Sequence, residues 1–157
     1  MDEDYLKMVL ALPDEFFKGW EWKDGDRFIL INRMKGKIVD YQDGTIGDSV
    51  IENGEVGYIW TSGYSGEYGF EKYNSEIKPI PSQEQLQKKC IDFENLDKRY
   101  TYSNDFSISK RFIALVIEGD LVHDIENKTL KEMWLEFTEY LVYDKIWNGE
   151  AWMPADD

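Results

Sequence analysis

The chain has 157 residues, of which 42% are hydrophobic and 15% aromatic, so it can bury a core and is not intrinsically disordered. Acids outnumber bases by 32 to 18, and the net charge of −14 argues against direct binding to nucleic acid or to an anionic membrane. The sequence has no apolar run near the roughly 20 residues of a membrane span, and it begins with acidic residues where a secretory signal has basic ones. We therefore expect a cytoplasmic protein.

The charge is distributed unevenly along the chain. Residues 27–42 carry four bases and one acid, whereas residues 43–76 carry one base and seven acids. We expect such stretches to form distinct faces once the chain folds. The overall acid excess predicts that any macromolecular partner has a basic surface.

The first predicted elements are a short helix and a pair of strands. Apolar residues recur at near-helical spacing over residues 4–12, and Pro13 ends that run or starts a second short turn. From residue 20 the pattern favours strands, with β-forming runs at 27–32 and 38–41. The Lys35-Gly36 pair between them predicts a chain reversal.

A second hairpin and an aromatic segment follow. Asn53-Gly54 is the preferred centre of a type I′ turn and predicts a hairpin from Ser49 to Trp60. The segment 61–70 is rich in Gly and Tyr and is predicted to be an exposed loop that leads into, or interrupts, another strand. Its aromatic residues predict a binding surface, because Tyr and Trp give rigid contact area at low entropic cost; alternatively, they fill the core. The predicted binding residues here are Trp60, Tyr64, Tyr68, Phe70 and Tyr73.

Two capping boxes indicate helices in the second half of the chain. Ser82 and Gln85 predict a helix from residue 83 to about residue 90. Thr129 and Glu132 predict a second helix, which ends near Tyr143. Between them, residues 107–118 show a helical apolar face, although the run 112–117 also fits a buried strand.

The chain is predicted to end in a small hairpin at 145–152, where Asn148-Gly149 forms the turn and Trp147 and Trp152 face each other. A β-rich stretch (20–78) followed by an α-rich stretch (79–157) within one core length predicts a single α+β domain.

Several of these segments resemble small proteins of unknown function that phages and prophages of Gram-positive bacteria encode. The shared features are the Pro-x-Gln-x-Gln-Leu-Gln helix start at 81–87, a Leu- and Trp-rich penultimate helix, and the terminal Trp-Asn-Gly-Glu-x-Trp hairpin at 147–152. The resemblance implies a viral or mobile-element context, in which small acidic accessory proteins often act on host proteins. It brings no catalytic motif to this chain.

Catalytic, metal and cofactor motifs are weak or missing in the sequence. His123 lies among acids, which is typical of a solvated surface histidine, and no nucleophile motif accompanies it. Asp40, Asp43 and Asp48 could gather oxygen ligands around a cation in a tight loop, but their spacing fails the EF-hand test. Cys90 is a single cysteine. We predict no catalytic residue, no metal and no cofactor.

The acids of the last helix suggest a sharper hypothesis. Glu132, Glu136 and Glu139 recur at helical spacing and are predicted to line one exposed stripe. Such a row could mimic the phosphates of nucleic acid and occupy the basic groove of a nucleic-acid-binding protein. The alternative is the ordinary solvated face of an amphipathic helix.

The leading functional hypothesis is a non-enzymatic phage or prophage accessory protein that binds a host protein with a basic surface, as an inhibitor that mimics nucleic-acid charge. The alternative is a domain that binds a small molecule or nucleotide in an aromatic pocket.

Overall fold

The computed structural model describes residues 3–97 and 105–155, and it confirms the α+β class with antiparallel sheets. The chain length predicts one domain, and the described residues divide into two compact units. The β unit is Pro13–Pro81, and the helical unit comprises the described parts of Met1–Leu12 and Ser82–Asp157. The N-terminal helix thus belongs with the C-terminal helices.

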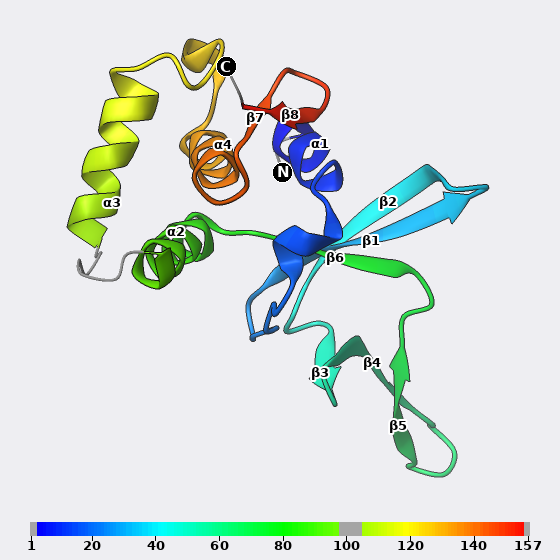
Figure 1. Cartoon of the computed structure of the whole chain (residues 1–157). Helices are drawn as coiled ribbons and strands as arrows, with labels where there is room; N and C mark the ends of the chain where they lie inside the picture. The colour runs from blue at the N-terminus through cyan, green and yellow to red at the C-terminus, as the bar shows by residue number, and fades with distance from the viewer. Residues whose placement is uncertain (1–2, 98–104, 156–157) are drawn as a thin grey trace. The chain divides into compact units, whose positions relative to one another are not determined.

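The β unit contains two three-stranded antiparallel sheets with strand orders β2-β1-β6 and β3-β4-β5 (Figure 1). The strands of the second sheet therefore lie between β2 and β6 in the chain. Both β2 and β6 pair with β1, the central strand of the first sheet. A 3-10 helix, η1, precedes the strands. The elements are η1 (Asp14–Phe17), β1 (Arg27–Met34), β2 (Lys37–Thr45), β3 (Val50–Glu52), β4 (Glu55–Thr61), β5 (Tyr68–Lys72) and β6 (Glu76–Ile80).

Both predicted hairpin turns of the β unit are confirmed. Lys35 and Gly36 have φ values of 55° and 80°, and Asn53 and Gly54 have φ values of 53° and 80°. Positive φ at both central residues is what a type I′ turn requires, and its twist matches that of the flanking strands. The two turns connect β1 to β2 and β3 to β4.

One hydrophobic cluster connects the two sheets of the β unit. Its buried centre is Phe28 on β1, Ile46 after β2 and Val56 on β4. Gly44 lies opposite Phe28 in the ladder, and a Cβ there would lie 2.7 Å from the Phe28 ring, so the ring covers bare backbone. Half-buried side chains that pack against the cluster are Trp22, Leu30, Ile51, Tyr73 and Ile77.

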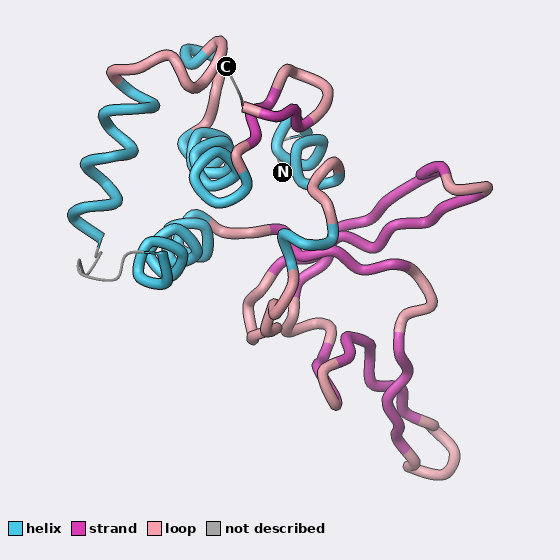
Figure 2. Tube along the Cα trace, in the orientation of Figure 1, coloured by secondary structure: helices cyan, strands magenta, loops and turns pink. Residues whose placement is uncertain are grey.

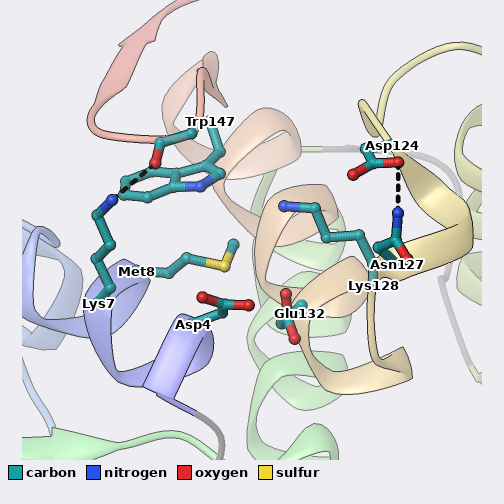
Figure 3. Close-up of a pocket in the computed structure, with 9 residues that line it drawn as sticks. Asp4, Lys7, Met8, Asp124, Asn127, Lys128, Glu132 and Trp147 are labelled. Atoms are coloured by element: carbon teal, nitrogen blue, oxygen red, sulfur yellow. Dashed lines mark hydrogen bonds between the residues drawn. The ribbon is translucent and has the colours of Figure 1, made fainter.

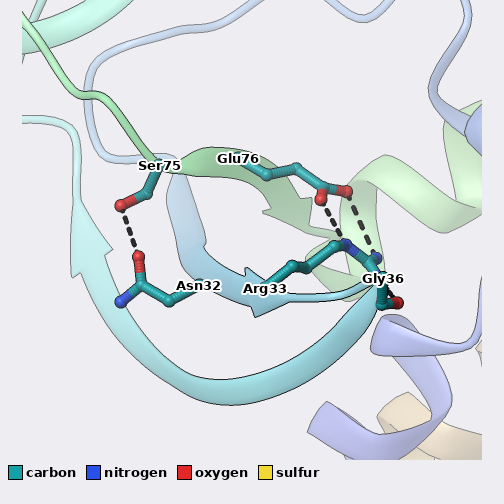
Figure 4. Close-up of polar contacts among 5 residues, drawn as sticks. All are labelled: Asn32, Arg33, Gly36, Ser75 and Glu76. Atoms are coloured by element: carbon teal, nitrogen blue, oxygen red, sulfur yellow. Dashed lines mark hydrogen bonds and ion pairs between the residues drawn. The ribbon is translucent and has the colours of Figure 1, made fainter.

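Polar contacts hold the β1–β2 hairpin to β6 (Figure 4). The Arg33 Nε donates to a Glu76 carboxylate oxygen at 2.6 Å, and the Arg33 Nη1 donates to the Gly36 carbonyl at 3.3 Å. The Ser75 hydroxyl donates to the Asn32 side-chain oxygen at 2.9 Å. These contacts attach the β1–β2 hairpin to the beginning of β6 and to the residue before it.

The helical unit contains α-helices, short turns of 3-10 and π-helix, and a terminal hairpin; Figure 2 draws the helices in cyan and the strands in magenta. The predicted 107–118 helix is confirmed, and the strand alternative is wrong, because α3 continues into a turn of π-helix, η2. None of the described helices is long and apolar enough to cross a membrane. The elements are α1 (Glu3–Leu10), α2 (Gln83–Asp97), α3 (Asp105–Phe112), η2 (Ile113–Ile117), η3 (Ile125–Asn127), α4 (Leu130–Tyr143), β7 (Lys145–Trp147) and β8 (Trp152–Pro154).

Both predicted capping boxes are present. The Ser82 amide donates to the Gln85 side chain at 2.8 Å and the Gln85 amide donates to the Ser82 hydroxyl at 3.2 Å. Thr129 and Glu132 form the equivalent pair of bonds at the start of α4. Reciprocal bonds of this kind satisfy backbone donors that a helix start leaves unpaired.

Aromatic packing and the terminal hairpin complete the helical unit. Phe112 stacks on Trp134 with ring centroids 4.0 Å apart. Trp147 and Trp152 are direct cross-strand partners, with centroids 5.0 Å apart, as the sequence predicts. The Trp152 Nε1–H also donates to the Met8 carbonyl at 3.1 Å, so the hairpin binds α1.

Candidate functional site

The candidate site is the hairpin formed by β4 and β5 with its connecting loop, residues 58–71, which we call the aromatic arm. Trp60 and Tyr68 are exposed, with Tyr68 keeping 76% of its surface, and Tyr64 is fully exposed. Phe70 is half-buried. These side chains therefore do not fill the core of the unit.

Tyr73 has a different environment from the other predicted binding residues. Its hydroxyl lies 2.8 Å from the Ser49 hydroxyl, and its ring packs beside Phe28 with centroids 6.2 Å apart. On its other side it contacts Tyr58, with centroids 5.6 Å apart. Tyr73 therefore joins the aromatic arm to the core.

The arm displays apolar groups on both of its faces. Residues paired across an antiparallel ladder project to the same face and alternate along each strand. Tyr58 and Trp60 thus lie on one face, and Ile59 pairs with Phe70 on the other. Tyr58, Ile59 and Trp60 are all exposed. A two-sided sheet of this kind leaves its apolar side chains available for contact.

Two of these aromatic rings pack against glycines of the neighbouring strand. Trp60 is the cross-strand partner of Gly69, and a Cβ at Gly69 would lie 2.7 Å from the indole. The Phe70 ring lies over Gly57, whose ladder partner is Lys72, and a Cβ at Gly57 would lie 2.7 Å from that ring. The two rings therefore pack directly on the glycine backbone, although the outer surface of the arm is exposed.

The loop that presents Tyr64 is closed by its own hydrogen bonds. The Ser62 amide donates to the Glu67 carbonyl at 2.7 Å, and the Gly66 amide donates to the Ser62 carbonyl at 3.1 Å. The Ser65 amide donates to the Ser62 hydroxyl at 3.3 Å. Tyr64 thus projects from an ordered turn.

The electrostatic surroundings of the arm are acidic. The exposed acids on or beside it include Glu52, Glu67 and Glu71, whereas Lys72 is paired with Glu55 at 3.2 Å. The Tyr58 hydroxyl donates to Glu71, and this hydrogen bond raises the pKa of Tyr58. The carboxylates are suited to a cationic group that also contacts the rings.

The prediction that Glu132, Glu136 and Glu139 line an exposed stripe is wrong. Each keeps 2% or less of its surface, because α4 packs against several elements, including α1, α2 and β7. Glu132 accepts from the Thr129 hydroxyl at 3.0 Å in the capping box. These side chains therefore cannot present a row of charges to a partner.

Burial also changes the acid–base properties of α4. Desolvation raises the pKa of Glu136 to about 7, and the nearby Lys128, whose Nζ lies 3.6 Å from a Glu136 oxygen, opposes the shift. Desolvation likewise raises the pKa of Cys90 to about 11. Cys90 lies 3.3 Å from the Thr138 hydroxyl and is a buried thiol, not an activated nucleophile.

The helical unit contains a pocket of about 210 Å³ that sequence reasoning missed (Figure 3). Asp4 and Glu132 place carboxylates beside Met8, and the Trp147 ring lies on the opposite side. The Lys7 Nζ donates to the Gly149 carbonyl at 3.1 Å at its edge. Its lining comes from three separate stretches of chain, and no local motif reports such a convergence. Asp124, Asn127 and Lys128 line the remaining side.

The other candidate groups do not assemble into a site. Of the three predicted cation ligands, Asp48 lies in the turn after β2, whereas Asp40 and Asp43 lie on β2 itself. Asp40 accepts from Asn32 at 2.6 Å, and Asp43 pairs with Arg27 at 2.9 Å. His123 is exposed. Within residues 3–97 and 105–155, no group of three or more His, Cys, Asp or Glu residues could hold a metal ion.

No protein-family model matches the chain, and no curated protein or solved structure matches it.

Proposed function

We propose that this chain is a protein-binding module that docks on a basic surface of a partner protein through the aromatic arm. The observation that carries the proposal is the exposure of Trp60, Tyr64 and Tyr68 on one ordered hairpin. A single exposed aromatic residue is ordinary on a protein surface, but several exposed aromatic side chains on one short hairpin are typical of an interaction site.

The chemistry of the arm favours a basic partner. Arginine and lysine bind over aromatic faces, and the carboxylates of Glu67 and Glu71 can pair with the same cations. The chain's net charge of −14 adds a long-range attraction that speeds encounter with a positive surface. The arm thus combines apolar anchors with electrostatic steering.

The resemblance to phage and prophage proteins supports a host protein as the partner and the host cytoplasm as the place of action. Charge mimicry of nucleic acid by α4 is not part of the proposal, because Glu132, Glu136 and Glu139 are buried. Blocking of a basic surface by the aromatic arm instead relies on ring contacts together with the exposed acids around them.

Site-specific photo-crosslinking tests this proposal. A benzophenone amino acid is placed at position 64, whose side chain is fully exposed, and in a matched control at Leu130, an exposed position of the helical unit. Both proteins are irradiated in a lysate of a Gram-positive host. We expect position 64 to crosslink a protein whose contact peptide is rich in Lys or Arg, and position 130 not to.

Competition identifies a specific contact. Excess unlabelled wild-type protein should abolish the crosslink, whereas an excess of the Tyr68→Ser variant should compete less well because an anchor side chain is removed. Equal crosslinking from positions 64 and 130, or a contact peptide without basic residues, would refute the proposal.

The pocket of the helical unit favours a second candidate, the binding of a small charged molecule. Its volume of about 210 Å³ is small, and its lysines, carboxylates and indole ring offer partners for both charges and for an apolar group. Titration with free amino acids and nucleotides, followed by the indole NH resonance of Trp147, tests this function. A resonance that stays unchanged with every probe would remove the candidate.

A further inference from the structure

The β1–β2 hairpin carries a second exposed surface, opposite in charge to the aromatic arm. We call residues 34–41 the basic arm. Met34 keeps 66% of its surface exposed and Val39 keeps 58%, and both lie on the β1–β2 hairpin. Lys35 lies in the turn of this hairpin, and Lys37 is the first residue of β2. Both lysines are exposed. Ile38 and Tyr41 extend the exposed apolar area.

The basic arm is ordered. At its base the Arg33–Glu76 ion pair and the Ser75–Asn32 hydrogen bond attach it to β6 (Figure 4). The ladder between β1 and β2 has an irregularity between Asn32 and Arg33, which is typical of a β-bulge, and such bulges increase strand twist and change the direction of the hairpin beyond them. The exposed apolar residues are thus displayed on a defined support.

The two arms are complementary in charge and both are apolar. The basic arm, residues 34–41, carries Lys35 and Lys37 against the single acid Asp40, whereas the aromatic arm, residues 58–71, carries Glu67 and Glu71 and no base. Both arms start from the cluster around Phe28 and extend in different directions from it (Figure 1). A contact between them therefore joins two chains.

We propose that the basic arm binds the aromatic arm of a second copy of this chain. Lys35 and Lys37 of one copy pair with acids such as Glu67 and Glu71 of the other, while Met34 and Val39 pack against the exposed rings. The inference rests on the proposed function, because it uses the same aromatic arm. The basic arm of a second copy is then one basic partner of the aromatic arm, and it competes with a host protein for that arm.

The geometry of the contact has a consequence for assembly. The two surfaces that meet are different, so the interface is head-to-tail and leaves one free arm of each kind on every dimer. Chains of −14 net charge repel one another at low salt, and at about 0.15 M salt a Debye length of about 8 Å screens the distant charges while close pairs persist. Association is therefore strongest near physiological ionic strength.

Sedimentation velocity with two complementary variants tests the inference. Lys35→Glu/Lys37→Glu disables the basic arm, and Tyr64→Ser/Tyr68→Ser disables the aromatic arm. We expect the wild-type sedimentation coefficient to rise with concentration, each variant alone to remain monomeric, and the equimolar mixture to form a 1:1 dimer through the two intact arms. Lys18→Glu/Lys23→Glu, with the same charge change at exposed positions of the same unit, should associate like the wild type.

The outcomes separate this inference from the proposed function. A wild-type protein that stays monomeric at every concentration, or a mixture of the two variants that does not dimerise, overturns the inference. If Lys35→Glu/Lys37→Glu still crosslinks a basic host protein from position 64, the proposed function stands by itself. If affinity capture shows that Tyr64→Ser/Tyr68→Ser binds the same host protein as well as the wild type does, the proposed function is wrong as well.

Discussion

The indole of Trp60 lies directly across Gly69, its partner in the β4–β5 ladder. An added Cβ at Gly69 would approach the indole to 2.7 Å, closer than side-chain carbon atoms normally come. The ring position that we assign to binding therefore depends on the absence of a side chain on the neighbouring strand. Sheet glycines at such positions weaken the strand, and an aromatic ring across the ladder compensates for them.

Gly69→Ala should displace the Trp60 ring. Overpacking of this kind costs about 1–3 kcal/mol, and the lower backbone entropy of alanine in the unfolded chain offsets about 0.4–1 kcal/mol of it. We expect a lower free energy of unfolding by about 1 kcal/mol and an altered near-ultraviolet circular dichroism spectrum. Gly63→Ala is the control, because nothing lies within 4 Å of a Cβ there. Equal unfolding curves for the two variants would contradict the packing described for Trp60.

Glu136→Gln should change how stability depends on pH. The pKa of Glu136 rises from 4.5 to about 7 on folding, because the carboxyl is desolvated, with Lys128 opposing and Glu132 reinforcing the shift. Between these values the unfolded chain releases the proton and the folded chain keeps it, so the wild type loses stability as the pH rises toward 7. Glutamine does not titrate. The free energy of unfolding of Glu136→Gln relative to that of the wild type should therefore increase by about 3 kcal/mol at most between pH 4 and pH 8.

Urea unfolding of both proteins across that pH range measures the difference. The effect belongs to Glu136 only if the two stability curves converge at low pH and separate at high pH. Parallel curves would mean that Glu136 titrates alike in the folded and unfolded protein and that its burial does not affect its ionisation.

Thr129→Ala should destabilise the protein more than Ser82→Ala, although both remove the hydroxyl of a capping box. Loss of the cap alone costs about 1 kcal/mol. At Thr129 the same change also removes the hydroxyl that donates to Glu132 at 3.0 Å, and Glu132 keeps only 2% of its surface exposed. Removing a donor from a buried carboxylate adds about 1–3 kcal/mol.

Thermal unfolding of the two alanine variants and of Thr129→Ser checks this prediction. Serine keeps the hydroxyl, so Thr129→Ser should remain close to wild type. A Ser82→Ala variant as unstable as Thr129→Ala would show that the burial of Glu132 adds nothing to the cap.

The elements that the sequence predicted correctly depend on a few neighbouring residues. The Asn53-Gly54 turn and the Ser82 and Thr129 caps involve contacts within four residues, and local chemistry decides them. The pairing of Trp147 with Trp152 follows from the short loop between them. Such features need no knowledge of the rest of the fold.

The errors arise where burial depends on distant parts of the chain. The pattern of α4 indicated one apolar face and one solvated face, but packing on several sides buries Glu132, Glu136 and Glu139 as well. The aromatic residues of the arm were ambiguous for the same reason. Tyr73 and Tyr64 occur in one aromatic-rich stretch, but only the cluster around Phe28 determines which of them is covered. The pocket of the helical unit and the positions of the aromatic and basic arms also depend on contacts between residues that are distant in the sequence.

The most direct test of the account is calorimetric titration of the wild type and of Tyr64→Ser/Tyr68→Ser with a synthetic peptide of alternating Arg and Leu, at two salt concentrations. Leu130→Ser serves as the matched control. We expect the wild type and the control to bind alike, more weakly at high salt, and the double variant to lose about tenfold or more in affinity. If the double variant binds the peptide as tightly as the wild type, net charge alone attracts the peptide and the aromatic arm is not the binding surface.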